Sequence, residues 1–372
     1  MNERLYWVWL TVTMKFAAVS ISRVLYKFTP REAYEADRDT LEAAGIDTRS
    51  VEKLSDKSLD RAKRIIEKCD KLDIKIITSD SRDYPRALDR LDDKPHVIYV
   101  RGDIGCIKGK KTACFIGTRN MTVRGEELAV EHARRLIDEG NVLISGIADG
   151  VDTVAARESI GRDAPTVAVL GVDIDKYYPQ KNERLIDRVA LSGAVISEYP
   201  PETGARFFPD RNRIIVGLSD TVNVIEAPIK SGSLIGARLA LKKRIPTFAC
   251  NGEGESFEGC RLLISEGAKP LSLDGKAPSQ EVSKKSIPRA ERHIPKAETL
   301  AATVDKPMPS IPVPESLRDL YGKIYERLRR GVCDENELHS LGYEVRYVSA
   351  TLSMMEIHGV IETLPGRKFK LK

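Results

Sequence analysis

Between residues 112 and 273, short apolar runs alternate with longer segments of helical periodicity. The predicted strands are 113–116, 142–145, 167–170, 194–197, 222–225 and 247–250. Strands that alternate with helices pair in parallel and carry helices on both faces of the sheet. Uninterrupted apolar runs suit strands that are buried on both sides. The sequence therefore predicts an α/β fold, a Rossmann-like doubly wound and mostly parallel sheet.

Two smaller units flank this predicted domain, which we assign to residues 73–275. Residues 1–72 alternate short apolar stripes with charges, which predicts a small helical domain of the SAM or helix-hairpin-helix type. Residues 276–314 are rich in proline and are expected to form an extended linker. Residues 315–372 show three helical segments and a hairpin, the outline of a winged-helix-like domain, which either reads DNA or docks a protein.

Composition narrows the function. Lys and Arg number 60 against 55 Asp and Glu, a net charge of +5, which excludes a histone-like polycation but not a local basic patch. No run of about 18 uncharged apolar residues is present, so we expect no membrane span. The six cysteines lack C-x-x-C spacing and a nearby histidine at ligand spacing. We therefore expect reduced thiols in a cytoplasmic protein, with no metal and no cofactor.

The residues that follow the predicted strands carry the functional signal, because ligands of open parallel sheets bind beyond the carboxyl ends of the strands. Glycine lets the backbone approach an oxyanion, helix N-termini offer free N–H groups, and arginine offers a two-pronged donor for phosphate. Several such loops converge on one sheet edge, which favours a phosphate ligand. The candidate binding residues are Gly117, Thr118, Arg119, Ser145, Gly146, Lys181, Asn182, Phe208, Arg211, Asn212, Arg213, Lys230, Ser231, Gly232 and Ser233.

The same loops favour nucleic acid over a free nucleotide. No G-x-G-x-x-G follows the first strand, and no G-x-x-x-x-G-K-[ST] motif appears. Basic residues with nearby aromatic rings suit a single strand, whose phosphates and exposed bases need both. Purely structural roles stay open: Asp152 as a helix N-cap, pairing of Arg211 and Arg213 with Glu198 and Glu226, Phe207 and Phe208 in the core, and Ser231–Ser233 as a helix start.

Six strings resemble the DNA-processing protein DprA (Smf) family in residue type, order and spacing. They are Phe-Ile-Gly-Thr-Arg at 115–119, Leu-Ile-Ser-Gly-Ile-Ala-Asp-Gly-Val-Asp at 143–152, Val-Ala-Val-Leu-Gly at 167–171, Ile-Ser-Glu-Tyr-Pro at 196–200, Phe-Pro-Asp-Arg-Asn-Arg-Ile-Ile at 208–215 and Ser-Gly-Ser-Leu-Ile at 231–235. The resemblance covers residues 74–272. It implies a Rossmann-like binder of single-stranded DNA that forms a homodimer, protects incoming strands and helps to load a RecA-type recombinase, notably in natural transformation.

The resemblance also assigns roles to particular residues. It implies phosphate contacts by Arg119 and by Lys181, near a Pro-x-x-Asn turn, with Ser145, Gly146 and residues 211–213 at the mouth of the site. Two positions depart from the family pattern. Ala156 stands where the family usually has histidine, and residues 171–175 read Gly-Val-Asp-Ile-Asp in place of Gly-x-Gly-x-Asp. These departures indicate a divergent member.

Three functions are carried forward. The leading hypothesis is a recombination mediator that is not an enzyme. The alternative is a Rossmann-like nucleotide-binding or nucleotide-cleaving enzyme of the phosphoribohydrolase type, with Glu226 assisting cleavage and Ser231–Ser233 holding the phosphate. The Gly-Gly-x-Gly-Thr loop expected of that enzyme is absent. The third is an adaptor that docks a partner or duplex DNA through residues 315–372.

Overall fold

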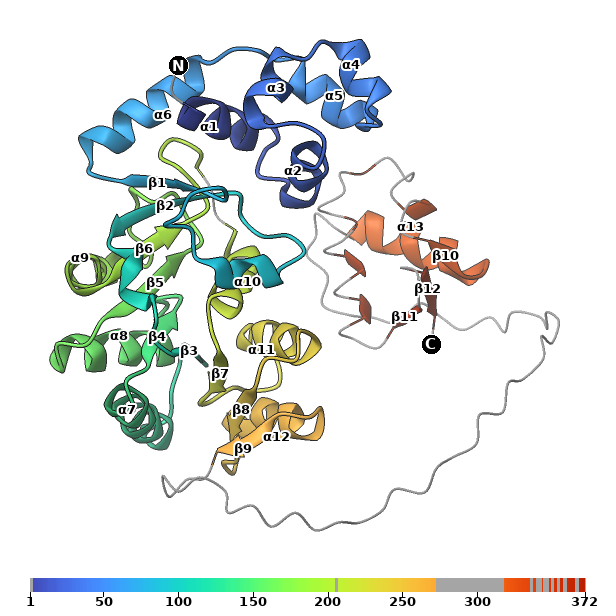
Figure 1. Ribbon diagram of the computed structural model, residues 1–372. Helices are drawn as coiled ribbons and strands as arrows, with labels where there is room; N and C mark the ends of the chain where they lie inside the picture. The colour runs from blue at the N-terminus through green and yellow to red at the C-terminus, as the bar shows by residue number, and fades with distance from the viewer. Residues whose placement is uncertain are drawn as a thin grey trace. The chain divides into compact units, whose positions relative to one another are not determined.

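The computed structural model describes residues 3–204, 207–271, 318–334, 337–338, 343, 348, 351–352, 355–356, 360–364 and 368–371 (Figure 1). The chain divides into two compact units, Met1–Ser283 and Lys284–Lys372. Each unit is described by itself. The predicted linker, residues 276–314, lies outside the described residues. Within the part of the chain that is described, no helix is both long enough and apolar enough to cross a bilayer.

One large sheet organises the first unit, and its strands run in the order β1-β2-β6-β5-β4-β3-β7-β8-β9 (Figure 1). All neighbours from β6 to β9 pair in parallel, whereas β1 and β2 are antiparallel additions at one edge. This confirms the predicted α/β fold with a mostly parallel sheet. The strands are β1 (Lys75–Thr78), β2 (Val97–Gly102), β3 (Thr112–Ile116), β4 (Val142–Ser145), β5 (Thr166–Leu170), β6 (Ala194–Ser197), β7 (Thr221–Val224), β8 (Thr247–Cys250) and β9 (Lys269–Leu271).

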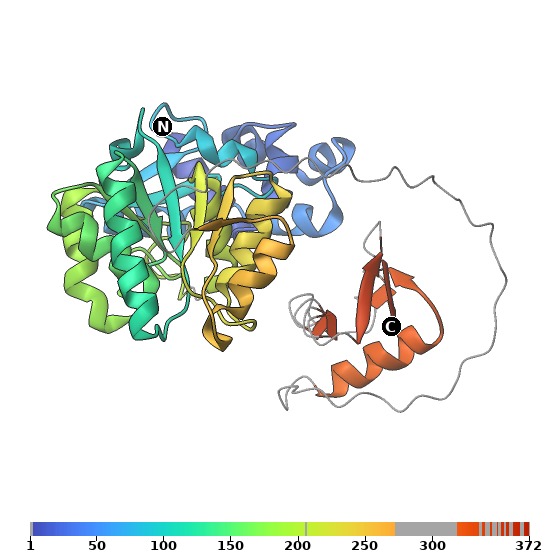
Figure 2. The same cartoon turned by 90° about the horizontal axis from the view of Figure 1, so that it is seen from below.

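Helices connect the parallel strands and cover both faces of the sheet (Figure 2). They are α7 (Val123–Asp138), α8 (Val151–Gly161), α9 (Glu183–Ser192), α10 (Phe208–Gly217), α11 (Ser233–Lys242) and α12 (Glu258–Ser265). Both α9 and α10 contact β5. Ile186 of α9 shares a core cluster with Ala168, whereas Ile214 of α10 shares another with Val169. Because successive strand residues point to opposite faces, α9 and α10 lie on opposite sides of the sheet.

Residues 3–71 form the predicted small helices, which are α1 (Glu3–Thr13), α2 (Ala18–Leu25), α3 (Pro30–Glu35), α4 (Arg38–Ala43), α5 (Thr48–Leu54) and α6 (Asp60–Lys71). Side chains cap several of them, because Asp37 and Asp47 accept bonds from helix N–H groups and Thr29 forms a capping box with Glu32. Leu10 of α1 packs in one cluster with Tyr99 of β2 and Leu170 of β5. The helices therefore share a hydrophobic core with one face of the sheet.

The second unit has its own small core, in which Leu320, Ile324 and Leu328 pack with Phe369. It contains α13 (Arg318–Arg329) and a sheet of β10 (Cys333–Asp334), β12 (Lys368–Leu371) and β11 (Ile361–Leu364), in that order. The predicted first helix and both hairpin strands are thus confirmed. The other two predicted helices fall largely outside the described residues. The winged-helix-like assignment and the domain boundaries stay predictions.

The shared core predicts that the N-terminal helices and the sheet unfold together. Trp7 and Trp9, the chain's two tryptophans, both lie in α1. Leu170→Ala removes a side chain that is 1% exposed on β5, and should cost about 2–5 kcal/mol. The midpoint of urea unfolding should fall by the same amount whether tryptophan fluorescence or circular dichroism follows the transition. Leu191→Ala, at an exposed position of α9, is the control. A fluorescence midpoint that stays unchanged would contradict the shared core.

Candidate functional site

The site lies where the chain order of the sheet reverses. β3 has β4 on one side and β7 on the other, so the connections that leave its carboxyl end and that of β7 diverge. Such a switch point opens a crevice in a doubly wound sheet. A pocket of about 410 Å³ occupies this place. Ten of the fifteen predicted residues line it: Gly117, Thr118, Arg119, Phe208, Arg211, Asn212, Lys230, Ser231, Gly232 and Ser233.

Free cationic side chains surround the mouth of this pocket. Arg119 and Lys230 are exposed, and neither side chain forms a hydrogen bond or ion pair with another described residue. The hydroxyls of Ser231 and Ser233 lie 2.7 Å apart where α11 begins, as predicted for a helix start. The first N–H groups of α11 are engaged within this loop, because Ser233 donates to the Ser231 hydroxyl at 3.4 Å and Leu234 donates to the Ser231 carbonyl at 3.2 Å. The charges of Arg119 and Lys230 therefore remain available to an anion.

A buried charged pair forms the floor. Arg211 Nη1 donates to the carbonyl oxygen of Gly146 at 2.8 Å and to that of Val169. Asp152 Oδ2 accepts from the backbone N–H of Gly146 at 3.0 Å and of Ala148 at 3.4 Å. Burial raises the pKa of Asp152 to about 6, although Arg211 and the two amides favour the charged form. Burial also lowers the pKa of Arg211 from its usual value.

The N-cap role considered for Asp152 is wrong. Gly150 occupies the N-cap of α8, with φ of 79°, and Asp152 lies in the first turn of the helix. Its carboxylate reaches back to the amides of the preceding loop. Gly150 has a positive φ, which a residue with a side chain rarely adopts, and the helix begins at the next residue, Val151. Asp152 thereby holds the loop after β4 in place.

Glu226 does not reach the pocket. Its side chain is fully buried, and Oε2 accepts from the Thr122 N–H at 3.0 Å and lies 3.3 Å from the Thr122 hydroxyl. A Cβ at Gly125 would collide with the same oxygen. Glu226 therefore secures the N-terminus of α7, which Thr122 caps.

This placement removes the acid that the phosphoribohydrolase alternative needs. The pairing of Glu226 with Arg211 or Arg213 is also absent among the described residues. Within the described part of the chain, its carboxylate bonds to Thr122, whereas Arg211 bonds to backbone carbonyls and Arg213 to other carboxylates. Glu226 is therefore a structural residue of the α7 terminus.

Arg213 also lies outside the pocket lining. It pairs with Glu198 at 2.8 Å and with Asp93 at 3.0 Å, and its side chain is 11% exposed. The predicted internal pairing with Glu198 is thus confirmed. Burial raises the pKa of Glu198 to about 7, although the guanidinium favours its charged form. Arg213 fixes α10 to the loop after β6.

Four more predicted residues build the neighbouring loops. The Ser145 hydroxyl donates to the carbonyl of Asp152 at 3.2 Å, and the buried Asn182 amide donates to the carbonyl of Ile147 at 3.0 Å. Lys181 is exposed and pairs with Asp149 at 3.0 Å. Gly146 packs directly against the Arg211 guanidinium. None of these four predicted residues lines the pocket, although Gly146 shapes its floor.

A second hollow, of about 350 Å³, adjoins the pocket and shares Arg119 and Ala148 with it. Phe208 lines the pocket and Tyr178 lines the second hollow, and their rings pack with centroids 4.5 Å apart. Phe207 is 46% exposed and packs against Tyr199. Tyr178 was not among the predicted site residues. Its signal was its position beside Pro179, just before the candidate Lys181.

No group of three or more His, Cys, Asp or Glu side chains that suits a metal ion occurs within the described ranges. The pocket lining offers cationic and hydroxyl side chains, and Phe208 packs against Tyr178 at its boundary. Such a set can hold a phosphate and stack a base.

Comparisons with known proteins point to one family. The family described as DNA recombination-mediator protein A matches residues 75–279. Protein Smf of Synechocystis is 29% identical over 99% of both chains, and DNA processing protein DprA of Bacillus subtilis is 36% identical over 53% of this chain and 68% of its own. The solved structure of DNA processing protein A from Streptococcus pneumoniae superposes with a TM-score of 0.64 at 28% identity, covering 73% of this chain and 95% of that one.

The close packing on the pocket floor generates a stability prediction. A Cβ at Gly146 would lie 2.5 Å from the Arg211 guanidinium, which two carbonyls hold in place. Gly146→Ala should therefore destabilise the fold by about 1–3 kcal/mol through overpacking. Gly232→Ala is the matched control in the same pocket, because a Cβ added there would have no atom within 4 Å. Urea unfolding of both variants measures the difference. Equal stability of the two variants would contradict the prediction, because it would show that the Arg211 side chain moves at little cost to make room for the added Cβ.

Proposed function

This chain belongs to the DNA recombination-mediator protein A family, and from that premise we propose that its switch-point pocket binds single-stranded DNA. The observation that carries the proposal is the unpartnered Arg119, within the described residues, at the junction of the pocket and the second hollow. An exposed guanidinium that folding leaves unpaired remains available for a phosphate, with two parallel donors. Lys230 adds a second cation on the rim.

The dimensions and the aromatic pair favour one strand over a duplex. A pocket of about 410 Å³ offers room for parts of a single strand. Tyr178 and Phe208 bring aromatic rings to the boundary of the two hollows, where bases of an unpaired strand are free to stack. Stacking of this kind contributes about 1–3 kcal/mol per base and tolerates any sequence. A paired duplex hides the faces of its bases and offers no such contact.

We propose further that the protein binds its strand without catalysis. Glu226, the carboxylate considered for cleavage, and Asp152, the acid beneath the pocket, both accept hydrogen bonds from backbone amides. Each carboxylate therefore has a structural role that accounts for its position. Release of free base from a nucleoside monophosphate would overturn this part of the proposal.

The finer assignments follow the family. We propose that the protein forms a homodimer in the cytoplasm, protects single strands and helps to load a RecA-type recombinase on them. We also retain as proposals the helical domain at 1–72, the binding domain at 73–275, the linker at 276–314 and the winged-helix-like domain at 315–372. Family membership supports the mediator role, and the shared core supports a binding domain that keeps its N-terminal helices.

Arg119→Ala should weaken binding of a labelled oligothymidylate about tenfold or more, because a hydrogen bond to a charged group contributes about 1.5–3 kcal/mol. The slope of log affinity against log salt should also fall by about 0.7, the value for one phosphate contact of a single strand. Fluorescence anisotropy at several NaCl concentrations measures both quantities. Arg64→Ala, at an exposed position of α6, is the control. An Arg119 variant that binds like the wild type would refute the assigned contact.

The buried acid beneath the pocket predicts a pH dependence. Burial holds the pKa of Asp152 near 6, above its ordinary 3.8, so the carboxyl gains its negative charge as the pH rises through 6. Phosphate affinity should fall about fivefold between pH 5 and pH 7.5, because a nearby like charge costs on the order of 1 kcal/mol. Asp152→Asn should remove this part of the pH dependence.

The variant comparison isolates Asp152 from other titrating groups. Burial lowers the pKa of His96 and His132 to about 4, so both stay neutral across this window. Glu198, whose pKa burial raises to about 7, titrates in both proteins. Anisotropy at constant ionic strength gives the two pH profiles. Parallel profiles for the wild type and Asp152→Asn would show that the carboxyl is remote from the bound phosphate.

A further inference from the structure

A third hollow, of about 500 Å³, lies at the opposite end of β3 from the binding pocket. Thr112, the first residue of β3, and Leu218, at the end of α10, line this amino-end hollow. Its basic lining residues are Lys75, Arg82, Arg86, Lys108 and Lys110. Its acidic lining residues are Asp83, Asp103 and Asp220. Basic side chains therefore predominate in this hollow, and none of them lines the binding pocket.

The lysines sit on a fixed turn. The N–H of Lys108 donates to the Gly105 carbonyl at 2.9 Å, and that of Lys110 donates to the Ile107 carbonyl at 3.1 Å. Gly109 between them has a φ of +72°, which a side chain would disfavour. The carbonyl of Lys111 accepts from the first residue of β4 at 2.8 Å. Because the backbone is already ordered, binding an anion there adds no cost for ordering the backbone.

The cationic heads remain available to a ligand. Lys108, Lys110 and Arg82 form no side-chain hydrogen bond or ion pair with any residue in the described part of the chain. Two of the three acids instead hold the backbone. Asp103 accepts from the Gly105 N–H at 2.9 Å, and Asp220 accepts from the Thr112 N–H at 3.0 Å. Folding thus leaves these three cations without an ion-pair partner among the described residues.

Helix α10 links the two sites. Phe208 at its start and Ile215 within it line the binding pocket, whereas Leu218 at its end lines the amino-end hollow. A helix of ten residues is about 15 Å long. Phosphates of a stacked strand are spaced at roughly 3.4 Å, so four or five nucleotides cover that length. A strand held in the pocket reaches the hollow if it extends by this amount.

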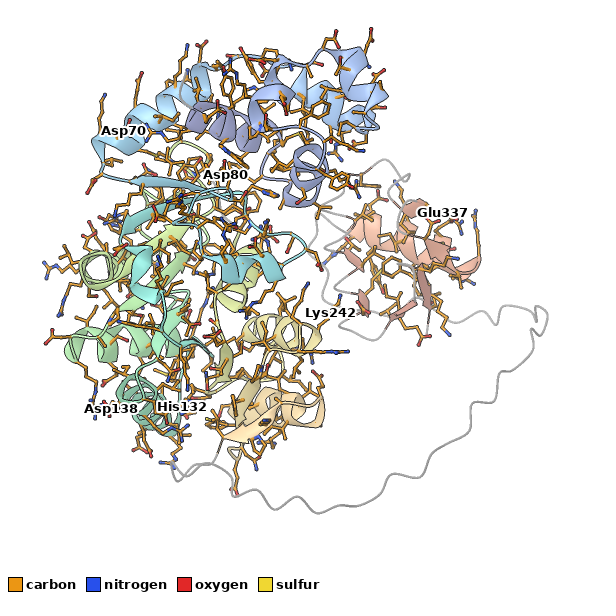
Figure 3. The ribbon with its side chains drawn as sticks, viewed as in Figure 1. Asp70, Asp80, His132, Asp138, Lys242 and Glu337 are labelled. Carbon is orange, nitrogen blue, oxygen red and sulfur yellow. The ribbon has the colours of Figure 1, made fainter. Side chains whose placement is uncertain are left out.

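The surface beside α7 contrasts with this path. A groove of about 900 Å³ runs along that helix and carries Glu126, Glu127, Glu131, Asp138 and Glu139 against Arg134 and Arg135. Figure 3 labels Asp138 and His132 on this helix, which lies near the bottom of the view, whereas β1 lies near the top. Excess negative charge repels a phosphate backbone. Between this groove and the amino-end hollow, the charge therefore favours the hollow as an extension of the binding surface.

We propose that the amino-end hollow is a second, sequence-independent contact for the phosphate backbone, engaged by single strands too long for the pocket alone. The inference rests on the proposed binding of single-stranded DNA and extends its footprint. Lysines act as point charges that attract phosphates of any sequence, and phosphate contacts position a strand without reading it. The ring among the hollow's lining residues, that of Tyr84, is buried, which fits a backbone contact without stacking.

The test compares short and long strands on the full chain. The double variant Lys108→Ala with Lys110→Ala removes the two lysines of the turn that line the hollow. Lys63→Ala with Lys71→Ala removes two exposed lysines of α6 and is the matched control. Anisotropy with labelled dT3, which is too short to span α10, and with labelled dT30 is measured over a range of NaCl concentrations. For dT30, the salt slope should fall by about 1.4, the value for two phosphate contacts. For dT3, affinity and slope should stay those of the wild type.

Each other outcome has a separate meaning. If the double variant and the wild type bind dT30 with equal affinity and slope, the hollow has no role in strand binding and the inference is overturned. A loss of polyglutamate binding together with unchanged dT30 binding also overturns it, in favour of an acidic protein partner. Failure of the wild type to bind either oligonucleotide refutes the proposed function itself. Thermal unfolding of the double variant verifies that the fold is intact.

Discussion

The binding pocket depends on the burial of one guanidinium. Moving a charged group out of water is costly unless hydrogen bonds and an opposite charge compensate it. Arg211 meets this requirement through the carbonyls of Gly146 and Val169 and through the nearby charge of Asp152. These groups come from the ends of β4 and β5 and from α8, while Arg211 comes from α10. One side chain therefore fastens four separate segments around the floor of the pocket.

This arrangement divides the arginines of the site into two kinds. Arg211 and Arg213 are buried and satisfied by carbonyls or carboxylates, so their charge serves the fold. Arg119 is exposed and has no partner among the described residues, so its charge remains for a ligand. The rigidity of the first kind benefits the second, because a fixed loop loses less entropy when a ligand binds.

The sequence predicted the central strands well and the edges poorly. Strands such as β4 and β6 are uninterrupted apolar runs, and burial on both faces requires that pattern. β1 and β9 are short edge strands that include lysine, and they become strands only because a neighbour supplies hydrogen bonds. At the site, residue type and position after a strand located ten of the pocket residues. The same criteria also selected Ser145 and Asn182, whose buried groups bond to backbone carbonyls, because the sequence does not reveal which way a polar side chain points.

Topology and loop composition have separate effects in this fold. The reversal of strand order at β3 and β7 creates a crevice whatever the loops contain, because neighbouring connections leave in opposite directions. A dinucleotide site would add a glycine-rich turn that brings the backbone against a pyrophosphate. Here Thr118 and Arg119 follow the glycine after β3, and Glu226 occupies the amide of Thr122 at the start of the next helix. The α7 N-terminus is thereby closed to an anion, and the exposed Arg119 and Lys230 are left to receive it. A carboxylate at one helix terminus and long cations on the rim distinguish this crevice from a dinucleotide site, because a flexible cation can follow the phosphates of a polymer whereas a glycine-rich turn fits one pyrophosphate.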